Sequence, residues 1–151
     1  MTTSVQNRHE LNPAVAIRPP TPADTAVLVA GRDIESRRFL GDGTPDPCPA
    51  FCILASGHVV GWVDFDTDRP WLLAGEVNIG YNVFPSHRAR GYASSAVQLL
   101  FDHLAAHTEH TVATLLINLH NEPSLLVAER VGCQRQPDVD GNAYFKVELT
   151  R

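Results

Sequence analysis

The sequence has few cysteines, a deficit of basic residues and no long apolar run. Its 151 residues include 3 cysteines, an odd number that disfavours a disulfide framework, so we expect free thiols. Twelve Lys and Arg against 17 Asp and Glu give a formal net charge of -5, which disfavours binding to nucleic acid or to an anionic membrane. The longest apolar runs, Ala50–Ala55 and Val112–Ile117, are far shorter than the roughly 20 residues of a membrane-spanning helix.

The N-terminus lacks the apolar stretch of a secretory signal, so the expected location is the cytoplasm. Residues 1–14 are polar and aperiodic, which predicts a flexible tail before a single domain over residues 15–151. No metal site is expected. Cys48 and Cys52 stand among prolines without a second ligand pair, and His103 and His107 lack the glutamate of a metalloprotease motif.

Hydrophobic periodicity predicts both strands and helices. The expected strands are Val15–Arg18, Ala50–Ala55, Val59–Asp66, Glu76–Val83, Thr111–Leu119 and Ala143–Leu149. The expected helices are Ala23–Ala30, Asp33–Leu40, Gly91–His107 and Ser124–Val131, with a loop at Thr67–Leu73 and a turn at Asp138–Asn142. This order predicts an α/β (α+β) domain with a mixed, mostly antiparallel sheet of about six or seven strands, flanked by about four helices.

The most informative segment is VFPSHRARGYASS, in which a strand ends, a basic turn follows and a helix begins at Gly91. Such a turn leaves backbone N–H groups unpaired at the positive end of a helix dipole and can bind phosphate. Gly91 would let the backbone approach the anion, while Arg88 and Arg90 would add positive charge. The alternative is an ordinary turn with two solvated arginines, because short motifs also occur by chance.

This segment resembles the pyrophosphate loop of the GCN5-related N-acetyltransferase (GNAT) superfamily. That loop reads Arg/Gln-x-x-Gly-x-Gly/Ala and is matched by Arg88, Gly91 and Ala93. Further along, a second motif of the superfamily, Asn-x-x-Ser before a helix ending in Gly-Phe, is matched by Asn121 and Ser124. The helix ends in Gly132, but Cys133 replaces the phenylalanine and is expected to be a small buried apolar residue.

The stretches NIGYNVFPSHRARGYASSAVQLLFDH and INLHNEPSLLVAERVGC are similar to the branch with the RimJ/RimL-type acetyltransferases of ribosomal-protein N-termini. The resemblance implies acyl-CoA binding between two splayed strands, Glu76–Val83 and Thr111–Leu119, with a bulge in the first of them. The implied cofactor-binding residues are Tyr81, Val83, Arg88, Ala89, Arg90, Gly91, Tyr92, Ala93, Ser94, Asn121 and Ser124. Asn121 can equally serve as a helix cap before Pro123.

The resemblance further implies an N-acetyltransferase that uses acetyl-CoA as co-substrate and needs no metal. The amine, on a small molecule or a protein N-terminus, would attack the thioester directly, with the Val83 N–H polarising the carbonyl. Many members carry a tyrosine acid where this chain has Ala128, which leaves the Ser124 hydroxyl or a water to protonate the thiolate. Glu76 is the candidate base, or else only a solvent-facing strand residue. Weaker candidate bases are Glu35 and His120.

Other readings of the sequence stay open. One is a noncatalytic acyl-CoA-binding module, and another is a domain that senses nucleotides or phosphate through the basic turn. A homodimer is compatible with the sequence, as with many soluble proteins. The acidic residues Asp33, Glu35, Asp64, Asp66 and Asp68 could attract a cationic amine or be merely solvated. The sequence does not identify the acceptor.

Overall fold

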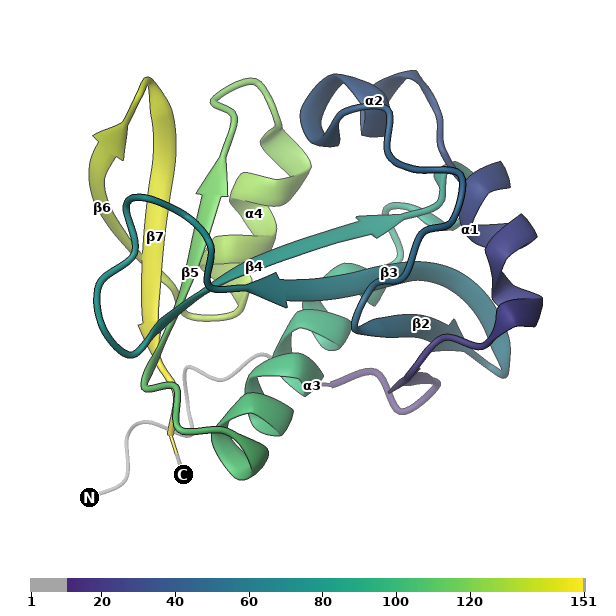
Figure 1. Ribbon diagram of the computed structural model, residues 1–151, viewed down its shortest axis with the longest axis horizontal. Helices are drawn as coiled ribbons and strands as arrows, with labels where there is room; N and C mark the ends of the chain where they lie inside the picture. The colour runs from purple at the N-terminus through teal and green to yellow at the C-terminus, as the bar shows by residue number, and fades with distance from the viewer. Residues whose placement is uncertain (1–10, 151) are drawn as a thin grey trace.

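The computed structural model describes residues 11–150, in which one sheet has the strand order β1-β2-β3-β4-β5-β7-β6 (Figure 1). The strands are β1 (Val15–Arg18), β2 (Phe51–Ala55), β3 (His58–Asp66), β4 (Glu76–Val83), β5 (Val112–Ile117), β6 (Gln134–Val139) and β7 (Asn142–Glu148). The helices are α1 (Thr25–Ala30), α2 (Ile34–Leu40), α3 (Tyr92–His107) and α4 (Glu122–Arg130), with 3-10 turns at Pro22–Asp24 and Pro85–His87. The predicted mixed sheet with four helices is confirmed.

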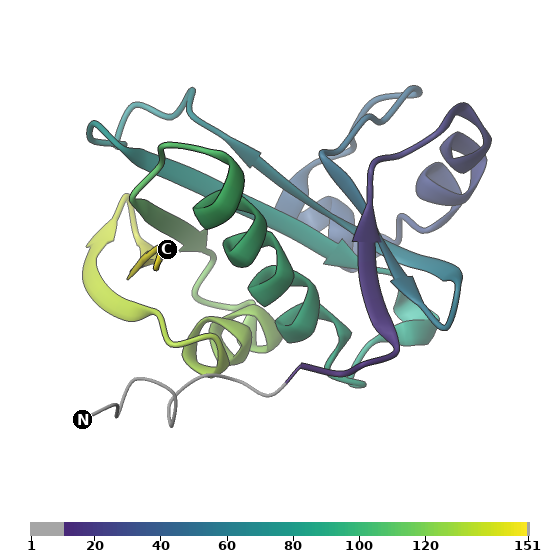
Figure 2. The same cartoon turned by 90° about the horizontal axis from the view of Figure 1, so that it is seen from below.

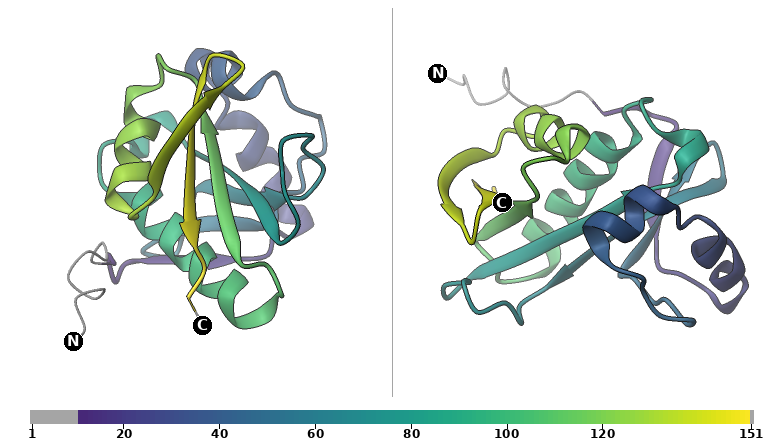
Figure 3. Two further views of the ribbon diagram at one scale, coloured as in Figure 1. Left: turned by 90° about the vertical axis from the view of Figure 1, so that its left-hand side faces the viewer. Right: turned by 90° about the horizontal axis from the view of Figure 1, so that it is seen from above.

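Helices cover both faces of the sheet. Figure 2 shows α3 and α4 side by side on one face, and the right panel of Figure 3 shows α1 and α2 on the other. The larger core lies under α3, whose apolar residues recur at spacings of three and four and are buried: Ala96, Val97, Leu100, Phe101 and Leu104. A smaller cluster of Leu28, Cys52 and Phe84 fixes α1 to the opposite face.

The central feature of the sheet is the early separation of its two parallel strands. β4 and β5 pair only between Glu76–Asn78 and Val112–Thr114, after which β4 follows β3 and β5 follows β7. Figure 1 shows the two strands running apart from this shared start. Beyond Asn78, the edge of β4 that faces β5 therefore has no strand partner.

The resemblance implied that a bulge in β4 causes this separation, and that expectation is wrong. From Gly61↔Val83 to Asp66↔Asn78 the register between β3 and β4 has no shift. The strands instead separate because each keeps its antiparallel partner, and strand twist rotates these two pairs away from each other.

Two details of the C-terminal half differ from the sequence prediction. Strand β6 was missed because its sequence, QRQPDV, is polar and contains Pro137, which is tolerated only at an edge or an irregularity. β6 is indeed an edge strand, and its register with β7 shifts between Gln136 and Val139, on either side of that proline. Helix α4 begins at Glu122, two residues earlier than predicted, because Asn121 caps it.

The predicted N-terminal tail lies mostly outside the described residues. Of the part that is described, the Asn12 backbone N–H donates to Ser95 Oγ at 3.0 Å, and the Val15 N–H donates to the Asn12 carbonyl. Among residues 11–150, no helix has the length and apolarity that a membrane span requires.

Candidate functional site

The turn between β4 and α3 presents a run of unpaired backbone donors. The N–H groups of His87 and Arg88 bond the carbonyls of Phe84 and Pro85. Within residues 11–150, the next six amides, from Ala89 to Ser94, bond no backbone acceptor. Ala89 (φ 62°) and Gly91 (φ 78°) are both left-handed, and such alternation makes a concave nest of N–H groups that suits an anion. A Cβ on Gly91 would meet no atom within 4 Å, so the approach to the nest is open.

Arg88 is tied to the scaffold and does not point its charge at this nest. Its Nε donates to the Val83 carbonyl at 2.7 Å, and Nη1 and Nη2 donate to the two Asp33 carboxylate oxygens at 2.7 and 3.1 Å. The hydrogen bond from Arg88 lowers the pKa of Asp33 to about 2. The positive charge expected from Arg88 is therefore neutralised, while Arg90 is exposed.

One edge of β4 has peptide groups that face the separated strand β5. The Phe84 N–H donates to the Val60 carbonyl on the β3 side at 2.8 Å. Because peptide groups alternate along a strand, those of Tyr81 and Val83 point to the other side, toward β5. β5 pairs with β4 only as far as Thr114, so within the described residues it leaves these groups unbonded, apart from the Val83 carbonyl that Arg88 holds. An extended ligand could bond them as an added strand would.

Two of the predicted site residues meet through their side chains. The Tyr81 hydroxyl donates to Ser124 Oγ at 2.8 Å, which joins β4 to α4. Burial raises the pKa of Tyr81 to about 12, so its hydroxyl stays protonated and remains a donor. Asn121 caps α4 through a bond from the Ser124 N–H to its Oδ1 at 3.4 Å, as the capping interpretation predicted.

Glu76, the predicted base, lies away from this pair. It is five residues from Tyr81, about 17 Å along the strand and on the opposite face of the sheet. It is 7% exposed, and its carboxylate accepts from Lys146 Nζ at 2.5 Å and from the Leu73 N–H at 3.0 Å. Burial alone would raise the pKa of Glu76, but these bonds outweigh burial and lower it. The structure thus does not bring the two predicted catalytic residues, Glu76 and Ser124, together.

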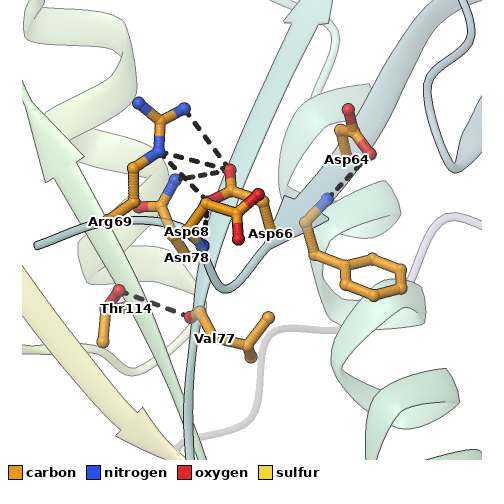
Figure 4. Close-up of polar contacts among 8 residues, drawn as sticks. Asp64, Asp66, Asp68, Arg69, Val77, Asn78 and Thr114 are labelled. Carbon is orange, nitrogen blue, oxygen red and sulfur yellow. Dashed lines mark hydrogen bonds and ion pairs between the residues drawn. The ribbon is translucent and has the colours of Figure 1, made fainter. Parts of the chain in front are cut away.

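Asp64 and Asp66 on β3 lie opposite Gly80 and Asn78 on β4, so strand alternation places them on the same face of the sheet as Glu76. Figure 4 shows Asp66 beside Arg69 and Asn78. The Asp66 carboxylate accepts from the Arg69 guanidinium at 3.1 Å and from Asn78 Nδ2 at 3.3 Å. The ion pair with Arg69 compensates much of its negative charge. Asp64 accepts from the backbone N–H groups of Ala50 and Phe65, and burial raises its pKa. Asp66 thus has a cationic partner, whereas Asp64 has none among the described residues.

The remaining candidates have simpler environments. Glu35 and His120, the weaker base candidates, are exposed. Cys133 is partly buried and packs against the main core, and all three cysteines are free, as predicted. Within residues 11–150, no group of three or more His, Cys, Asp or Glu side chains is arranged to hold a metal ion.

Sequence reasoning missed two contacts that shape the site. Nothing in the sequence indicated that Asp33 would hold Arg88, since the two are 55 residues apart. The contact of Tyr81 with α4 was partly predictable from the sequence. Strand alternation places Tyr81 on the same face as Val77 and Ile79, but the identity of its partner depends on how α4 packs.

Comparison with known proteins gives a consistent assignment. A family model described as an acetyltransferase (GNAT) domain matches residues 14–134. A GNAT-family acetyltransferase structure from Bacillus anthracis superposes with a TM-score of 0.76 at 17% identity, covering 93% of this chain and 98% of that one. No curated protein sequence matches the chain significantly.

Two further solved structures have CoA bound. Aminoglycoside acetyltransferase AAC(6')-Ib in complex with coenzyme A has a TM-score of 0.74 at 19% identity, covering 89% of this chain and 94% of that one. RimL, a ribosomal L7/L12 alpha-N-protein acetyltransferase in complex with coenzyme A, has a TM-score of 0.69 at 16% identity, covering 93% and 97%. At these identities the likeness concerns the fold.

Proposed function

The chain belongs to the acetyltransferase (GNAT) domain family, and from this premise we propose that it transfers an acetyl group from acetyl-CoA to a primary amine. The observation that carries the proposal is the continuity of two sets of free backbone groups. The peptide edge of β4 at Tyr81 and Val83 leads directly into the nest of amides at Ala89–Ser94. An extended arm that ends in a pyrophosphate has the shape and the acceptors to match both.

Acetyl-CoA supplies the activated thioester, and the chain's residues have three tasks around it. The Val83 N–H faces the separated strands and is a backbone donor suited to polarise the thioester carbonyl. The Ser124 hydroxyl is the proposed proton donor to the departing sulfur. The amides of Ala89–Ser94 hold the phosphates, and the side chain of Asn121 orders the start of α4 beneath Ser124.

The acceptor is proposed to be an amine that needs little help to lose its proton. At pH 7 a lysine ε-amine requires roughly 4 to 5 kcal/mol for deprotonation, whereas an α-amine requires only about 1 kcal/mol. Glu76 would have to leave Lys146 before it could accept a proton, so its contacts favour a structural role. A protein N-terminus or a small molecule with a weakly basic amine therefore suits this site. RimL acts on a ribosomal protein N-terminus and AAC(6')-Ib on aminoglycosides, so relatives use both kinds of acceptor.

A noncatalytic acyl-CoA-binding module is the second candidate. It is favoured by the environment of Glu76, which leaves the site without the base that was predicted from the sequence. The two candidates differ in one measurable property. Only an enzyme releases CoA continuously when acetyl-CoA and an amine are both present.

The first experiment is a calorimetric titration of the wild type with acetyl-CoA, CoA and ATP. We expect micromolar binding of both CoA species and weaker binding of ATP. Gly91→Asp places a carboxylate in front of the free amides and should weaken acetyl-CoA binding by more than about tenfold. Gly91→Asn is the matched control because it has the same size, tolerates the left-handed backbone and carries no charge. Failure of the wild type to bind either CoA species would overturn the proposal.

A screen for the acceptor follows if acetyl-CoA binds. Short peptides with free N-termini and polyamine or aminoglycoside amines would be compared by the rate of CoA release. Turnover with any of them supports the enzyme, and binding without turnover on all of them supports the binding module.

A further inference from the structure

The hydrogen bond between Tyr81 and Ser124 is the only side-chain hydrogen bond that the described residues provide between the far half of β4 and helix α4. It lies three residues past Asn78, the last residue of β4 that pairs with β5. The bond therefore joins β4 to α4 beyond the point where β4 stops pairing with β5.

The bond also decides what the Ser124 hydroxyl can do. A serine hydroxyl has one proton to donate and lone pairs that accept. Because Ser124 Oγ accepts from Tyr81, its own proton is directed elsewhere, and no residue in the described part of the chain accepts it. The Ser124 backbone N–H is bonded to Asn121 Oδ1, which fixes the residue at the start of α4.

Tyr81 takes part in the site in two ways. Its peptide group lies on the edge of β4 that faces the separated strand, while its ring lies on the α3 and α4 face and reaches Ser124. One residue thus connects the strand edge where the thioester arm would lie with the hydroxyl that would protonate it. A shift of β4 along its axis would move both together.

We propose that Tyr81 is a positioning residue whose hydroxyl holds Ser124 Oγ as an acceptor and so directs the Ser124 proton at the sulfur of bound CoA. This inference rests on the proposed function. As the amine nitrogen bonds to the carbonyl carbon, the carbon–sulfur bond breaks and the sulfur takes the Ser124 proton. Ser124 recovers a proton from water, which also receives the proton lost by the amine nitrogen. Tyr81 keeps its own proton throughout.

The test uses CoA itself, so it does not depend on the acceptor. Donation from Ser124 to the sulfur favours the thiolate and should lower the pKa of the bound CoA thiol, which is read from thiolate absorbance as the pH of the saturated complex is raised. In Ser124→Ala we expect the bound thiol to titrate about one pH unit higher than in the wild type. Tyr81→Phe, which keeps the ring, should also raise the pKa of the bound CoA thiol, with little change in the dissociation constant of CoA.

The double variant distinguishes action through Ser124 from a separate effect. If Tyr81 acts through Ser124, then Tyr81→Phe in a Ser124→Ala background adds no further shift. Additive shifts, or no shift in Tyr81→Phe, would overturn the inference. Tyr144→Phe is the matched control, because this buried tyrosine lies on β7 and, two residues from Lys146, faces the side of the sheet that holds Glu76, opposite Tyr81. It should leave the thiol titration unchanged.

The outcomes also separate this inference from the proposed function. If the wild type does not bind CoA, the proposed function fails first. If all variants bind CoA alike and titrate alike, CoA binding stands and the role of Tyr81 is rejected. Should Tyr81→Phe fold poorly by thermal unfolding, Ser124→Thr provides the second measurement. It retains a hydroxyl at the same position and is expected to titrate like the wild type, and a shift as large as that of Ser124→Ala would contradict the proposal.

Discussion

Arg88 donates to both carboxylate oxygens of Asp33, at 2.7 and 3.1 Å, and so joins the turn before α3 to the first residue before α2. Asp33 also caps α2, because its Oδ1 accepts from the Ser36 N–H at 2.9 Å. One carboxylate thus holds two elements that lie 55 residues apart and that flank the end of β4.

Substitution of Asp33 should separate these two roles. Asp33→Asn keeps a good helix cap but loses the charge, and we expect it to lower the free energy of unfolding by about 1 kcal/mol. Asp33→Ala loses both the helix cap and the charge, and it should lower the free energy of unfolding by about 2 kcal/mol. Urea denaturation at pH 7 measures both values. Equal losses in the two variants would show that the cap contributes nothing.

The same ion pair predicts a defined pH dependence. The folded pKa of Asp33 is lowered to about 2, whereas an unfolded aspartate titrates near about 3.9. A lowered folded pKa means that the stabilisation is complete above the unfolded value and is lost as the pH falls toward 2. The difference in unfolding free energy between wild type and Asp33→Asn should be constant from pH 7 to 5 and shrink between pH 4 and 2. A difference that stays constant down to pH 2.5 would contradict this.

Much of the sheet was predictable because its strands carry the apolar alternation or runs that burial requires. β4 was predicted with its observed ends, since Pro85 stops it and the polar loop precedes it. β6 was not, because a polar edge strand that contains Pro137 has no hydrophobic pattern and is held only by its pairing with β7.

The candidate site was predictable only where it depends on local backbone. The unpaired amides follow from the strand, turn and helix order around Gly91, which the sequence carries directly. The partners of Arg88 and Glu76 come from distant segments, Asp33 and Lys146, and no local pattern encodes such pairs. Arg88 therefore appeared as a phosphate ligand and Glu76 as a base, although both side chains are committed to ion pairs.

Ala89 is strained, and glycine should relieve that strain. Its φ of 62° is left-handed, a conformation that costs a residue with a Cβ about 1 to 2 kcal/mol. After the entropy that glycine loses on folding, Ala89→Gly should stabilise the protein by about 0.5 kcal/mol. Ala106→Gly, at an exposed position in the last turn of α3, is the control and should destabilise by about 0.5 kcal/mol. Thermal unfolding should show a higher melting temperature for Ala89→Gly and a lower one for Ala106→Gly. A loss of stability in Ala89→Gly would contradict the prediction.

Removal of Lys146 should leave Glu76 as a buried charge without its cation. The Glu76 side chain is only 6% exposed in this pair and that of Lys146 is 26% exposed. Lys146→Met should therefore lower the free energy of unfolding by about 3 kcal/mol at neutral pH. The double variant Lys146→Met with Glu76→Gln should lower it by less, because no buried charge is then left without a partner. Chemical denaturation of both variants tests this. If the double variant is less stable than Lys146→Met alone, Glu76 is not held by the ion pair.

The three free cysteines should react very differently, and their reactivity bears on the chemistry. Cys48 is exposed, whereas Cys52 is 0% exposed. Burial raises the pKa of Cys52 to about 11 and that of Cys133 to about 12.

An aromatic disulfide reagent at pH 8 should therefore modify one thiol quickly in the native protein and all three in urea. Cys48→Ser should abolish the fast reaction. A thiol held in its protonated form is also a poor nucleophile toward a thioester, so direct attack by the amine predicts that no acetyl group is transferred to Cys133 or Cys52. Mass spectrometry of the protein after incubation with acetyl-CoA measures this, and an acetylated Cys133 that forms and decays at the rate of CoA release would replace direct attack with a covalent route.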